Sequence, residues 1–309
     1  MNRGKADLAL GFNAVLWGVT FVLVKSALRD ISPVLFLAMR FSLATVALAA
    51  IFHWQSHWQS HWQSHWQSRG RQRVRPTGKA LAAGGMIGIF LFLGYLLQTV
   101  GLQSTTPPKS AFLTGLATVM VPLLGALVYR IKPRMVEVAG VLTATLGMGL
   151  MTLEGPIGSI ASVSRGDVLT FFGAVAFSAH IVATGHFAEQ IGYEVLSLTQ
   201  IGAAAVASLS LFWWVETPRV QWHTLTVCAI LITGLLCTAL AFTVQAWAQH
   251  YTTSTRTALI YALEPVVAWI TSYCLVGEGL SGQGATGAAL ILGGVLIVEM
   301  KPFDSREHL

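Results

Sequence analysis

Ionisable side chains inside apolar segments are the residues of this chain best suited to chemistry, and Glu264 is the clearest example. It lies near the middle of an apolar stretch, residues 256–276, and directly precedes Pro265. A carboxylate inside a membrane is costly, so it is a candidate functional group by default. Pro265 cannot donate a backbone hydrogen bond, and a kink there would leave carbonyl groups facing a cavity. We expect Glu264 to bind a cationic or amine group, to carry a proton, or to serve as a structural partner for a buried cation.

Two cations also fall within apolar stretches. Arg40 lies about eight residues into the stretch 33–52, or roughly 12 Å from its boundary at the helical rise. An unpaired Arg at that depth is improbable, so we expect it to pair with Glu264 or to bind a solute carboxylate. Lys25 lies near the end of its stretch, where its long side chain can reach the interface. We expect Lys25 either to set the charge of a cavity or to be structural.

Further polar and aromatic side chains are spread over several apolar stretches. His180 lies mid-stretch and is either a satisfied packing residue or a group that titrates near neutral pH. Each of the others taken singly is more typical of packing than of ligand binding. With Glu264, Arg40 and His180, they predict a polar and aromatic solute-binding lining, contributed by Trp17, Tyr95, Gln98, Thr114, Gln245 and Tyr261.

The composition requires that most of this chain avoid water. It has 309 residues, of which 54% are hydrophobic and 10% charged, whereas a soluble domain has roughly 25% charged residues. A spanning helix needs about 20 apolar residues, and the runs here are near that length without alternation, which favours helices over a barrel. We predict an all-α membrane protein with ten transmembrane helices, at about 8–28, 33–52, 79–100, 108–129, 135–153, 167–187, 194–215, 223–247, 256–276 and 283–300.

The distribution of Lys and Arg predicts the orientation. Most of the 19 Lys and Arg fall in segments that share one side when the N-terminus is cytoplasmic. Ten spans return the C-terminus to the same side. The first stretch is too long for a signal-peptide core and is expected to be a retained span. We therefore predict a multi-pass membrane protein with both termini cytoplasmic.

A segment of the chain is echoed in its second half. Residues 109–116, KSAFLTGL, correspond to residues 256–263, RTALIYAL, and Pro122 or Pro265 follows. Five spans in each half is an odd number, so the second copy enters the membrane from the opposite side. This is the inverted-repeat plan of many transporters. The two prolines differ in spacing by about one helical turn, so we expect them on a similar helix face.

The echo divides the chain into two repeats, 1–153 and 167–300, with a linker at 154–166 and a tail at 301–309. Within the first repeat, the tetrapeptide His-Trp-Gln-Ser recurs four times over 53–68. It is typical of a His metal tract, of a Trp-anchored interfacial helix, or of an insert tolerated in a cytoplasmic loop. We favour the insert, which would not define the activity.

The fifth and tenth stretches contain little charge and many small residues. Small side chains spaced by four residues let two helices approach closely. These stretches are expected to form a scaffold, using Ala139, Thr143 and Gly147 in one and Ala285, Ala289 and Gly293 in the other.

Several functional classes lack their motifs. The chain has no phosphate-binding loop, no His-Glu-x-x-His helix and no Gly-x-Ser-x-Gly elbow. Cys228, Cys237 and Cys274 lie in apolar stretches without the spacing of a zinc site. The net charge of +6 is concentrated in loops. We therefore expect no catalytic residues, cofactor, metal or nucleic-acid partner.

The chain resembles the EamA-type transporters of the drug/metabolite transporter superfamily over roughly 8–153 and 167–300. The resemblance rests on WGVTF at 17–21, FLAMRF at 36–41, SAFLTGL at 110–116 with Val121-Pro122, and TALIYALEP at 257–265 followed by Gly277-Glu278. It implies ten helices in two inverted five-helix repeats, with a central cavity between spans 1–4 and 6–9. It also implies movement of small metabolites, often export of amino acids or related compounds.

We accordingly predict a secondary transporter, and not an enzyme, that exports a small-molecule solute by alternating access across a lipid bilayer, the bacterial inner membrane. A lipid-linked sugar flippase is the main alternative. An intramembrane enzyme would need a nucleophile or a set of metal ligands at mid-depth, and we find neither in the sequence. A sensor would normally need an output domain, and the tails are too short for one. The sequence leaves open the substrate, the direction, coupling to a proton or other ion, and whether the protein is a monomer or a homodimer.

Overall fold

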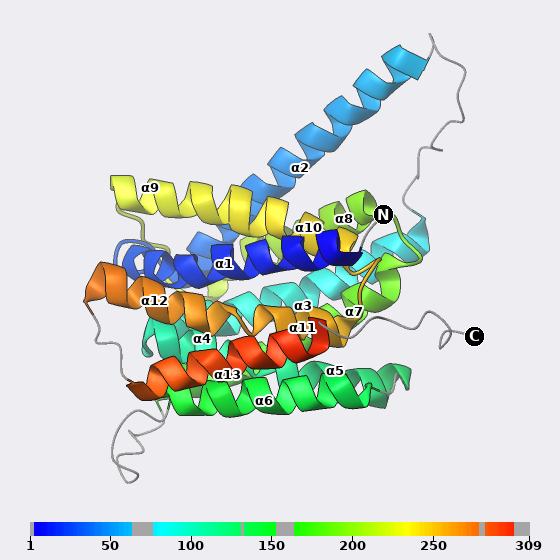
Figure 1. Cartoon of the computed structure of the whole chain (residues 1–309). Helices are drawn as coiled ribbons and strands as arrows, with labels where there is room; N and C mark the ends of the chain where they lie inside the picture. Colours follow the sequence, from blue (N-terminus) through cyan, green and yellow to red (C-terminus); the bar gives the residue numbers. More distant parts are fainter. Residues whose placement is uncertain (1–2, 64–76, 131–132, 153–163, 278–281, 300–309) are drawn as a thin grey trace.

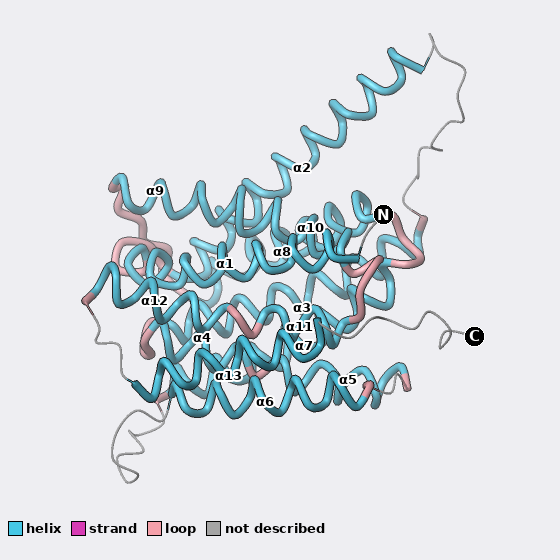
Figure 2. The backbone as a smooth tube through the Cα atoms, viewed as in Figure 1, coloured by secondary structure: helices cyan, strands magenta, loops and turns pink. Residues whose placement is uncertain are grey.

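The computed structural model describes residues 3–63, 77–130, 133–152, 164–277 and 282–299, and these form a bundle of roughly parallel and antiparallel helices (Figure 1). Connections between the helices are short where they are described (Figure 2). Within the described residues β-structure is limited to one isolated bridge, between Ile31 and Val220.

The first six helices are α1 Arg3–Ala27, α2 Pro33–Gln63, α3 Gly78–Leu102, α4 Pro107–Gly115, α5 Ala117–Tyr129 and α6 Met135–Thr152. The later elements are α7 Arg165–Ala188, α8 Tyr193–Val215, α9 Thr224–Leu231, the π-helix η1 Ile232–Leu240, α10 Ala241–Ala248, α11 Ser254–Tyr261, α12 Glu264–Val276 and α13 Gly282–Glu299.

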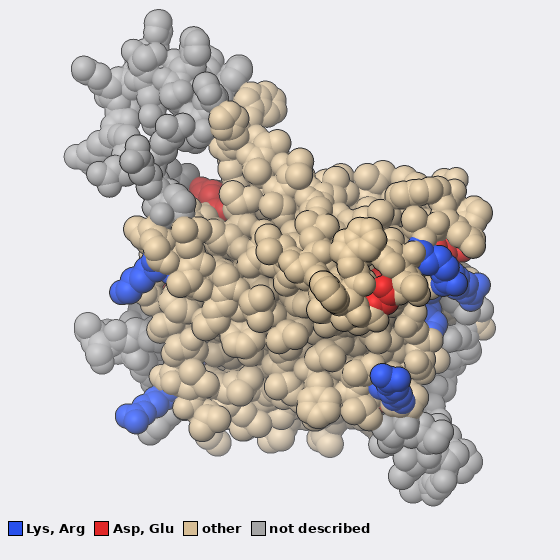
Figure 3. All heavy atoms as spheres, turned by 180° about the vertical axis from the view of Figure 1, so that it is seen from behind, with Lys and Arg blue, Asp and Glu red and all other residues tan. Residues whose placement is uncertain are grey.

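Eight helical segments in the described ranges are long and apolar enough to cross a membrane, which confirms a multi-spanning all-α fold. Two shorter apolar helices, Met135–Leu150 and Gly282–Ile297, lie within α6 and α13. On the face seen in Figure 3, charged side chains gather toward the two ends of the bundle and leave an uncharged band between them. The eight segments are Arg3–Ala27, Pro33–Gln55, Gly78–Leu102, Pro107–Tyr129, Arg165–Ala188, Tyr193–Val215, Thr224–Ala248 and Ser254–Leu275.

Helices before residue 153 pack mainly against helices after residue 164. The most extensive helix contacts are α6 with α13, α3 with α7 and α8, α2 with α8, and α1 with α12. The largest cluster of buried side chains likewise joins both parts, from Phe36 and Leu91 to Ile201 and Phe242. The two parts of the chain therefore share one core.

The α6–α13 contact uses a different helix face from the one predicted. A Cβ on Gly147 would lie 2.5 Å from the Gly287 carbonyl oxygen, and one on Gly294 would lie 2.6 Å from that of Gly140. Of the small residues predicted to form this contact, Gly147 lies in it. Ala139, Ala285 and Ala289 are exposed instead, and a Cβ added to Gly293 would have no neighbour within 4 Å. The expected stripe was wrong because small residues occur on more than one face of α13.

Two of the spans are interrupted near their middle, each at the end of its echoed segment. α4 stops at Gly115 and α5 begins at Ala117, while α11 stops at Tyr261 and α12 begins at Glu264. Pro265 lies at the start of α12, whereas Pro122 lies inside α5. The two prolines thus occupy different places relative to the breaks, and the first break occurs without a proline.

Another span contains a π-helix, η1, which sequence reasoning did not predict. The Thr238 hydroxyl donates to the Thr233 carbonyl, five residues earlier, at 2.8 Å. Such wide turns are rare and are often found at functional sites. Here η1 packs against α2, where a Cβ on Gly234 would meet the Leu43 side chain at 2.9 Å.

The described part of the His-Trp-Gln-Ser repeat is helical. α2 continues as one helix to Gln63, and its last part extends away from the bundle (Figure 1). Residues 64–68 of the repeat lie outside the described residues, as do most of the 154–166 linker and the 301–309 tail.

Candidate solute cavity

A cavity of about 810 Å³, a volume that includes space open to solvent, lies at the centre of the bundle. Its walls come from α1, α2, α3, α4, α5, α7, α10, α11 and α12, while α6 and α13 contribute none of the lining. Pockets for small molecules typically combine apolar walls with a few polar groups. The cavity thus has the chemistry of a small-solute site.

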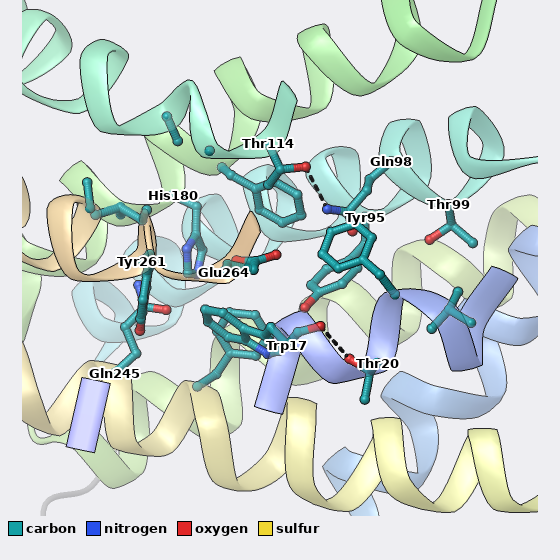
Figure 4. Close-up of a pocket in the computed structure, with 18 of the residues that line it drawn as sticks. Trp17, Thr20, Tyr95, Gln98, Thr99, Thr114, His180, Gln245, Tyr261 and Glu264 are labelled. Atoms are coloured by element: carbon teal, nitrogen blue, oxygen red, sulfur yellow. Dashed lines mark hydrogen bonds between the residues drawn. The ribbon is translucent and has the colours of Figure 1, made fainter. Parts of the chain in front are cut away.

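All of the residues predicted to bind solute line this cavity. Figure 4 shows Glu264 at the start of α12, near the centre of the group. The lining includes Trp17, Arg40, Tyr95, Gln98, Thr114, His180, Gln245, Tyr261 and Glu264. Their common position is observed, and their contact with a solute stays a prediction.

Lys25 is placed differently from the others. Its ammonium group donates to the carbonyl oxygens of Leu102, Gln103 and Thr105, at 2.6, 3.0 and 3.0 Å. It is absent from the cavity lining. Lys25 therefore holds the end of α3 to the end of α1. This position agrees with the second of the two roles expected for it, a structural one.

Glu264 is the only acidic residue among the described residues that line the cavity, and 8% of its surface is exposed. Among the described residues, no hydrogen bond or ion pair engages its carboxylate. The helix break places Glu264 in the first turn of α12. Gly18 lets α1 pass close by, because a Cβ there would lie 2.8 Å from the Glu264 carbonyl oxygen. An unengaged carboxylate beside a cavity is well placed to receive a donor from a solute.

Arg40 is held by α3 and η1 and does not pair with Glu264. Its Nε donates to the Thr238 hydroxyl at 2.6 Å, and one terminal nitrogen donates to the Tyr95 hydroxyl at 3.0 Å. The same nitrogen reaches the Cys237 carbonyl oxygen at 3.3 Å. The guanidinium also lies 4.2 Å from the centre of the Tyr95 ring, within range of a cation–π contact. These contacts fix a positive charge in the wall of the cavity.

Aromatic rings form much of the wall between these charges. The Trp17 indole N–H donates to the Cys237 carbonyl oxygen at 2.9 Å, and its ring packs edge-on against Tyr261 at 4.8 Å between centroids. Phe242 lies 5.3 Å from Trp17 and 5.4 Å from His180 by the same measure. Sequence reasoning missed Phe242, because a phenylalanine in an apolar helix carries no polar signal.

Three of the polar side chains in the lining, His180, Gln98 and Gln245, have hydrogen-bond partners within the protein. The His180 Nε2 and the Gln200 Oε1 are 2.8 Å apart, and the His180 residue is 1% exposed. Gln98 donates to the Thr114 hydroxyl at 2.9 Å, and Gln245 donates to Gln249 at 2.9 Å. These bonds orient the side chains without requiring a bound solute.

The lining positions recur at two fixed spacings along the chain. Trp17, Thr20 and Phe21 on α1 are followed 160 residues later by Phe177, His180 and Ile181 on α7, all of which line the cavity. A spacing of 147 residues relates lining positions on α3–α5 to others on α10–α12. The pairs are Tyr95 with Phe242, Gln98 with Gln245, Thr114 with Tyr261, and Ala117 with Glu264. An alignment of the two halves would therefore have found Phe177 and Phe242.

Comparison with known proteins decides the family. The model of the EamA-like transporter family matches residues 4–153 and again residues 164–300. This chain belongs to the EamA-like transporter family. The two matched segments correspond closely to the parts of the chain before and after the central linker.

Relatives of this EamA-like chain are named as transporters. An uncharacterised transporter of Archaeoglobus fulgidus is 31% identical, with 97% of this chain and 88% of the relative covered. A probable amino-acid metabolite efflux pump of Salmonella typhimurium is 24% identical, with 96% and 95% covered. A crystal structure matches with a TM-score of 0.73 at 22% identity, covering 96% of this chain and 97% of that one, which supports the fold alone.

Proposed function

We propose that this protein is a secondary transporter that exports small metabolites, amino acids or related compounds among them, by alternating access. The observation that carries the proposal is the central cavity, whose walls hold one unengaged carboxylate, one fixed guanidinium and several aromatic rings. Ionisable groups at membrane depth typically mark the path of a solute or an ion.

The cavity chemistry suits a solute with a positively charged amine and an apolar portion. Glu264 would accept hydrogen bonds from the amine, and Trp17, Phe242 and Tyr261 would pack against the apolar part. Arg40 places a positive charge in the same cavity and would attract a carboxylate. The relative named as an amino-acid metabolite efflux pump supports this class of solute.

We further propose ten spans in two inverted five-helix repeats, with α6 and α13 as the fifth and tenth spans. The recurrence of lining positions at fixed spacings supports the repeats. We place the protein in the bacterial inner membrane, and the Lys and Arg distribution supports cytoplasmic termini. A transporter of this kind requires the solute and the bilayer as partners, and the proposal holds for a monomer or a homodimer and with or without proton coupling.

The test is efflux from liposomes that contain the purified protein and a panel of labelled amino acids and amines. For any solute that the wild type moves, Glu264→Gln should reduce the rate at least tenfold, because it removes the carboxylate that receives the amine. Glu189→Gln, at an exposed position near the end of α7, is the matched control. Equal rates for Glu264→Gln and wild type would remove Glu264 from the mechanism, and no movement of any solute would reject the proposed class.

A further inference from the structure

Among the described residues, two ion pairs outside the cavity each join a helix of one half to a helix of the other, whereas Arg3 and Asp7 pair within α1 at 3.9 Å. Arg256 at the start of α11 donates to Asp7 near the start of α1, at 2.8 Å. Lys109 at the start of α4 donates to Asp167 at the start of α7, at 2.6 Å. The cavity site uses neither pair, so their role requires a separate account.

The two pairs are equivalent positions of the repeated pattern. Asp7 and Asp167 are 160 residues apart, the spacing that relates Trp17 to Phe177 in the cavity wall. Lys109 and Arg256 are 147 residues apart, the spacing that relates Gln98 to Gln245. The spacings that relate the cavity lining therefore also relate the ion pairs.

The local structure around the two cations matches as well. Each cation follows a threonine by three residues, and that threonine is the N-cap of the helix. The Thr106 hydroxyl accepts from the Lys109 backbone N–H at 3.4 Å, and the Thr253 hydroxyl accepts from that of Arg256 at 3.2 Å. The echo therefore extends to the caps of α4 and α11.

The pairs lie at opposite ends of the bundle. Lys25 bonds the Thr105 carbonyl oxygen at 3.0 Å, and the Thr105 hydroxyl bonds Asp167 at 2.7 Å, so Asp167 lies at the end of the bundle where α1 stops. Asp7 lies near the start of α1. The eighteen residues from Asp7 to Lys25 correspond to about 27 Å of helix. We call these the Asp7 end and the Asp167 end.

Electrostatics gives each pair a reason to hold its helices together. A cation in the first turn of a helix is disfavoured by the positive end of the helix dipole. Both Lys109 and Arg256 occupy that unfavourable place, and a carboxylate from the facing helix compensates each one. Loss of a pair would thus release the start of α4 from α7, or the start of α11 from α1.

The two ends differ in how tightly they are sealed. The Arg256 and Asp7 side chains are 4% and 6% exposed, whereas Lys109 is 33% exposed and Asp167 5%. An apolar cluster that includes Leu10, Ala14 and Val121 lies on the Asp7 side of the cavity. At the other side, the cavity lining reaches Val24 and Leu102, close to the end of α1 and α3. The Asp7 end is the more firmly closed of the two.

We propose that the two ion pairs are equivalent latches, each closing one entrance to the cavity, and that they open in alternation. This inference rests on the proposed alternating access. Breaking Asp7–Arg256 opens the cavity toward the Asp7 end, and breaking Lys109–Asp167 opens it toward the Asp167 end. The broken spans provide the moving parts, since α4 and α11 are the short segments that carry the cations and end beside the cavity.

The test measures which side of the membrane reaches the cavity. Ala117 lines the cavity at the start of α5 and would be replaced by cysteine in a full chain whose Cys228, Cys237 and Cys274 are changed to alanine. A membrane-impermeant methanethiosulfonate is then added to right-side-out and to inverted membrane vesicles. The labelling rate of Ala117→Cys in each preparation reports access from each end, and no solute is needed.

The latch model predicts opposite effects for the two pairs. Arg256→Gln should raise labelling from the Asp7 end by roughly tenfold and not from the Asp167 end, and Lys109→Gln should do the reverse. Lys5→Gln and Arg29→Gln remove exposed cations near the same two ends and should leave both rates unchanged. Equal changes at both ends, or no change at either end for both variants, would overturn the proposal.

Charge-exchanged variants separate a latch from a folding defect. Asp7→Arg with Arg256→Asp, and Asp167→Lys with Lys109→Asp, exchange the charges of each pair. The first exchange also carries Arg3→Gln, because Arg3 pairs with Asp7, and the second removes the bonds that Asp167 accepts from Thr105 and the Ser164 N–H. A return of both labelling rates to wild-type values in these variants supports the latches, and rates that stay raised in chains that remain monodisperse contradict them. Solute efflux is measured separately, so one-sided labelling without any transport would reject the proposed function while leaving the latches standing.

Discussion

At the scale of single residues, the cavity is organised by a few side chains whose positions depend on backbone groups. Arg40 and Trp17 both bond the Cys237 carbonyl oxygen, and Arg40 also bonds the Thr238 hydroxyl. Both acceptors belong to η1. The positive charge and the largest ring of the cavity wall are therefore oriented by the same turn of helix.

The Thr238 hydroxyl gives a sharp test of this arrangement. Thr238→Val would leave the buried Arg40 Nε without its acceptor, which should lower the free energy of unfolding by about 1–3 kcal/mol. Thr243→Val is the matched control, because the Thr243 hydroxyl bonds only the Ala239 carbonyl of its own helix. Thermal unfolding in detergent would measure both, and equal shifts would show that Arg40 does not depend on Thr238.

Sequence reasoning found the polar residues of the cavity because polarity inside an apolar stretch is itself a signal. Glu264, Arg40 and His180 stand out for that reason. Phe242 and Phe177 do not, although both line the cavity, since phenylalanine serves equally well facing lipid or core. The partner of Arg40 was also missed, because Thr238 becomes available only through the fold of η1.

At the scale of helices, glycine sets how closely α1 approaches the start of α12. A Cβ at Gly18 would lie 2.6 Å from the Val267 Cβ and 2.8 Å from the Glu264 carbonyl oxygen. Both contacts involve atoms that cannot rotate away. Glu264 therefore stays at its place in the cavity only while position 18 lacks a side chain.

Substitution of Gly18 should accordingly harm both stability and transport. We expect Gly18→Ala to destabilise the protein by about 1–3 kcal/mol, because the helices must separate to admit the methyl group. Gly11→Ala on the same helix meets nothing within 4 Å and should be neutral or stabilising by up to about 1 kcal/mol. Thermal unfolding and liposome efflux would be measured for both, and a harmless Gly18→Ala would contradict the close crossing.

The α6–α13 contact offers the same comparison away from the cavity. Gly147→Ala would place its Cβ 2.5 Å from the Gly287 carbonyl oxygen, whereas Gly149→Ala meets nothing within 4 Å. We expect only Gly147→Ala to lower the unfolding temperature, by an amount equivalent to about 1–3 kcal/mol. Since neither helix lines the cavity, folded Gly147→Ala should keep the affinity of the wild type for its solute, and a selective loss of affinity would argue against a scaffold role.

Helix positions were predictable because apolar runs bounded by Pro and Gly define them. The breaks within two spans and the π-helix were not, because they depend on how neighbouring helices pack. Gly115 ends α4 against the Met148 side chain, and a Cβ there would lie 2.8 Å from its sulfur. The sequence around Gly115 contains no pattern that predicts its contact with Met148. The predicted face of α13 was wrong for the same reason.

At the scale of the whole molecule, the part of α2 that carries the His-Trp-Gln-Ser repeat extends away from the bundle and from the cavity (Figure 1). Deletion of residues 57–68 leaves one copy of the tetrapeptide. We expect this deletion to keep efflux within about twofold of wild type, because the described part of the deleted segment is the end of α2, which extends away from the bundle and the cavity. A loss of transport in chains that still insert, measured in the liposome assay, would assign the repeat a role.

The extensive contacts between the two halves carry a consequence for ancestry. Each half buries its faces mainly against the other. On the proposed inverted repeat, a half-length ancestor would be stable only beside a second, oppositely oriented copy of itself. In such a pair, every substitution alters both walls at once. Joining two such copies in one chain would remove that constraint, and position 264 holds a glutamate where its counterpart at the 147-residue spacing, position 117, holds an alanine. When the two copies vary independently, one of them can gain an acidic residue, here Glu264, while the equivalent position of the other stays apolar.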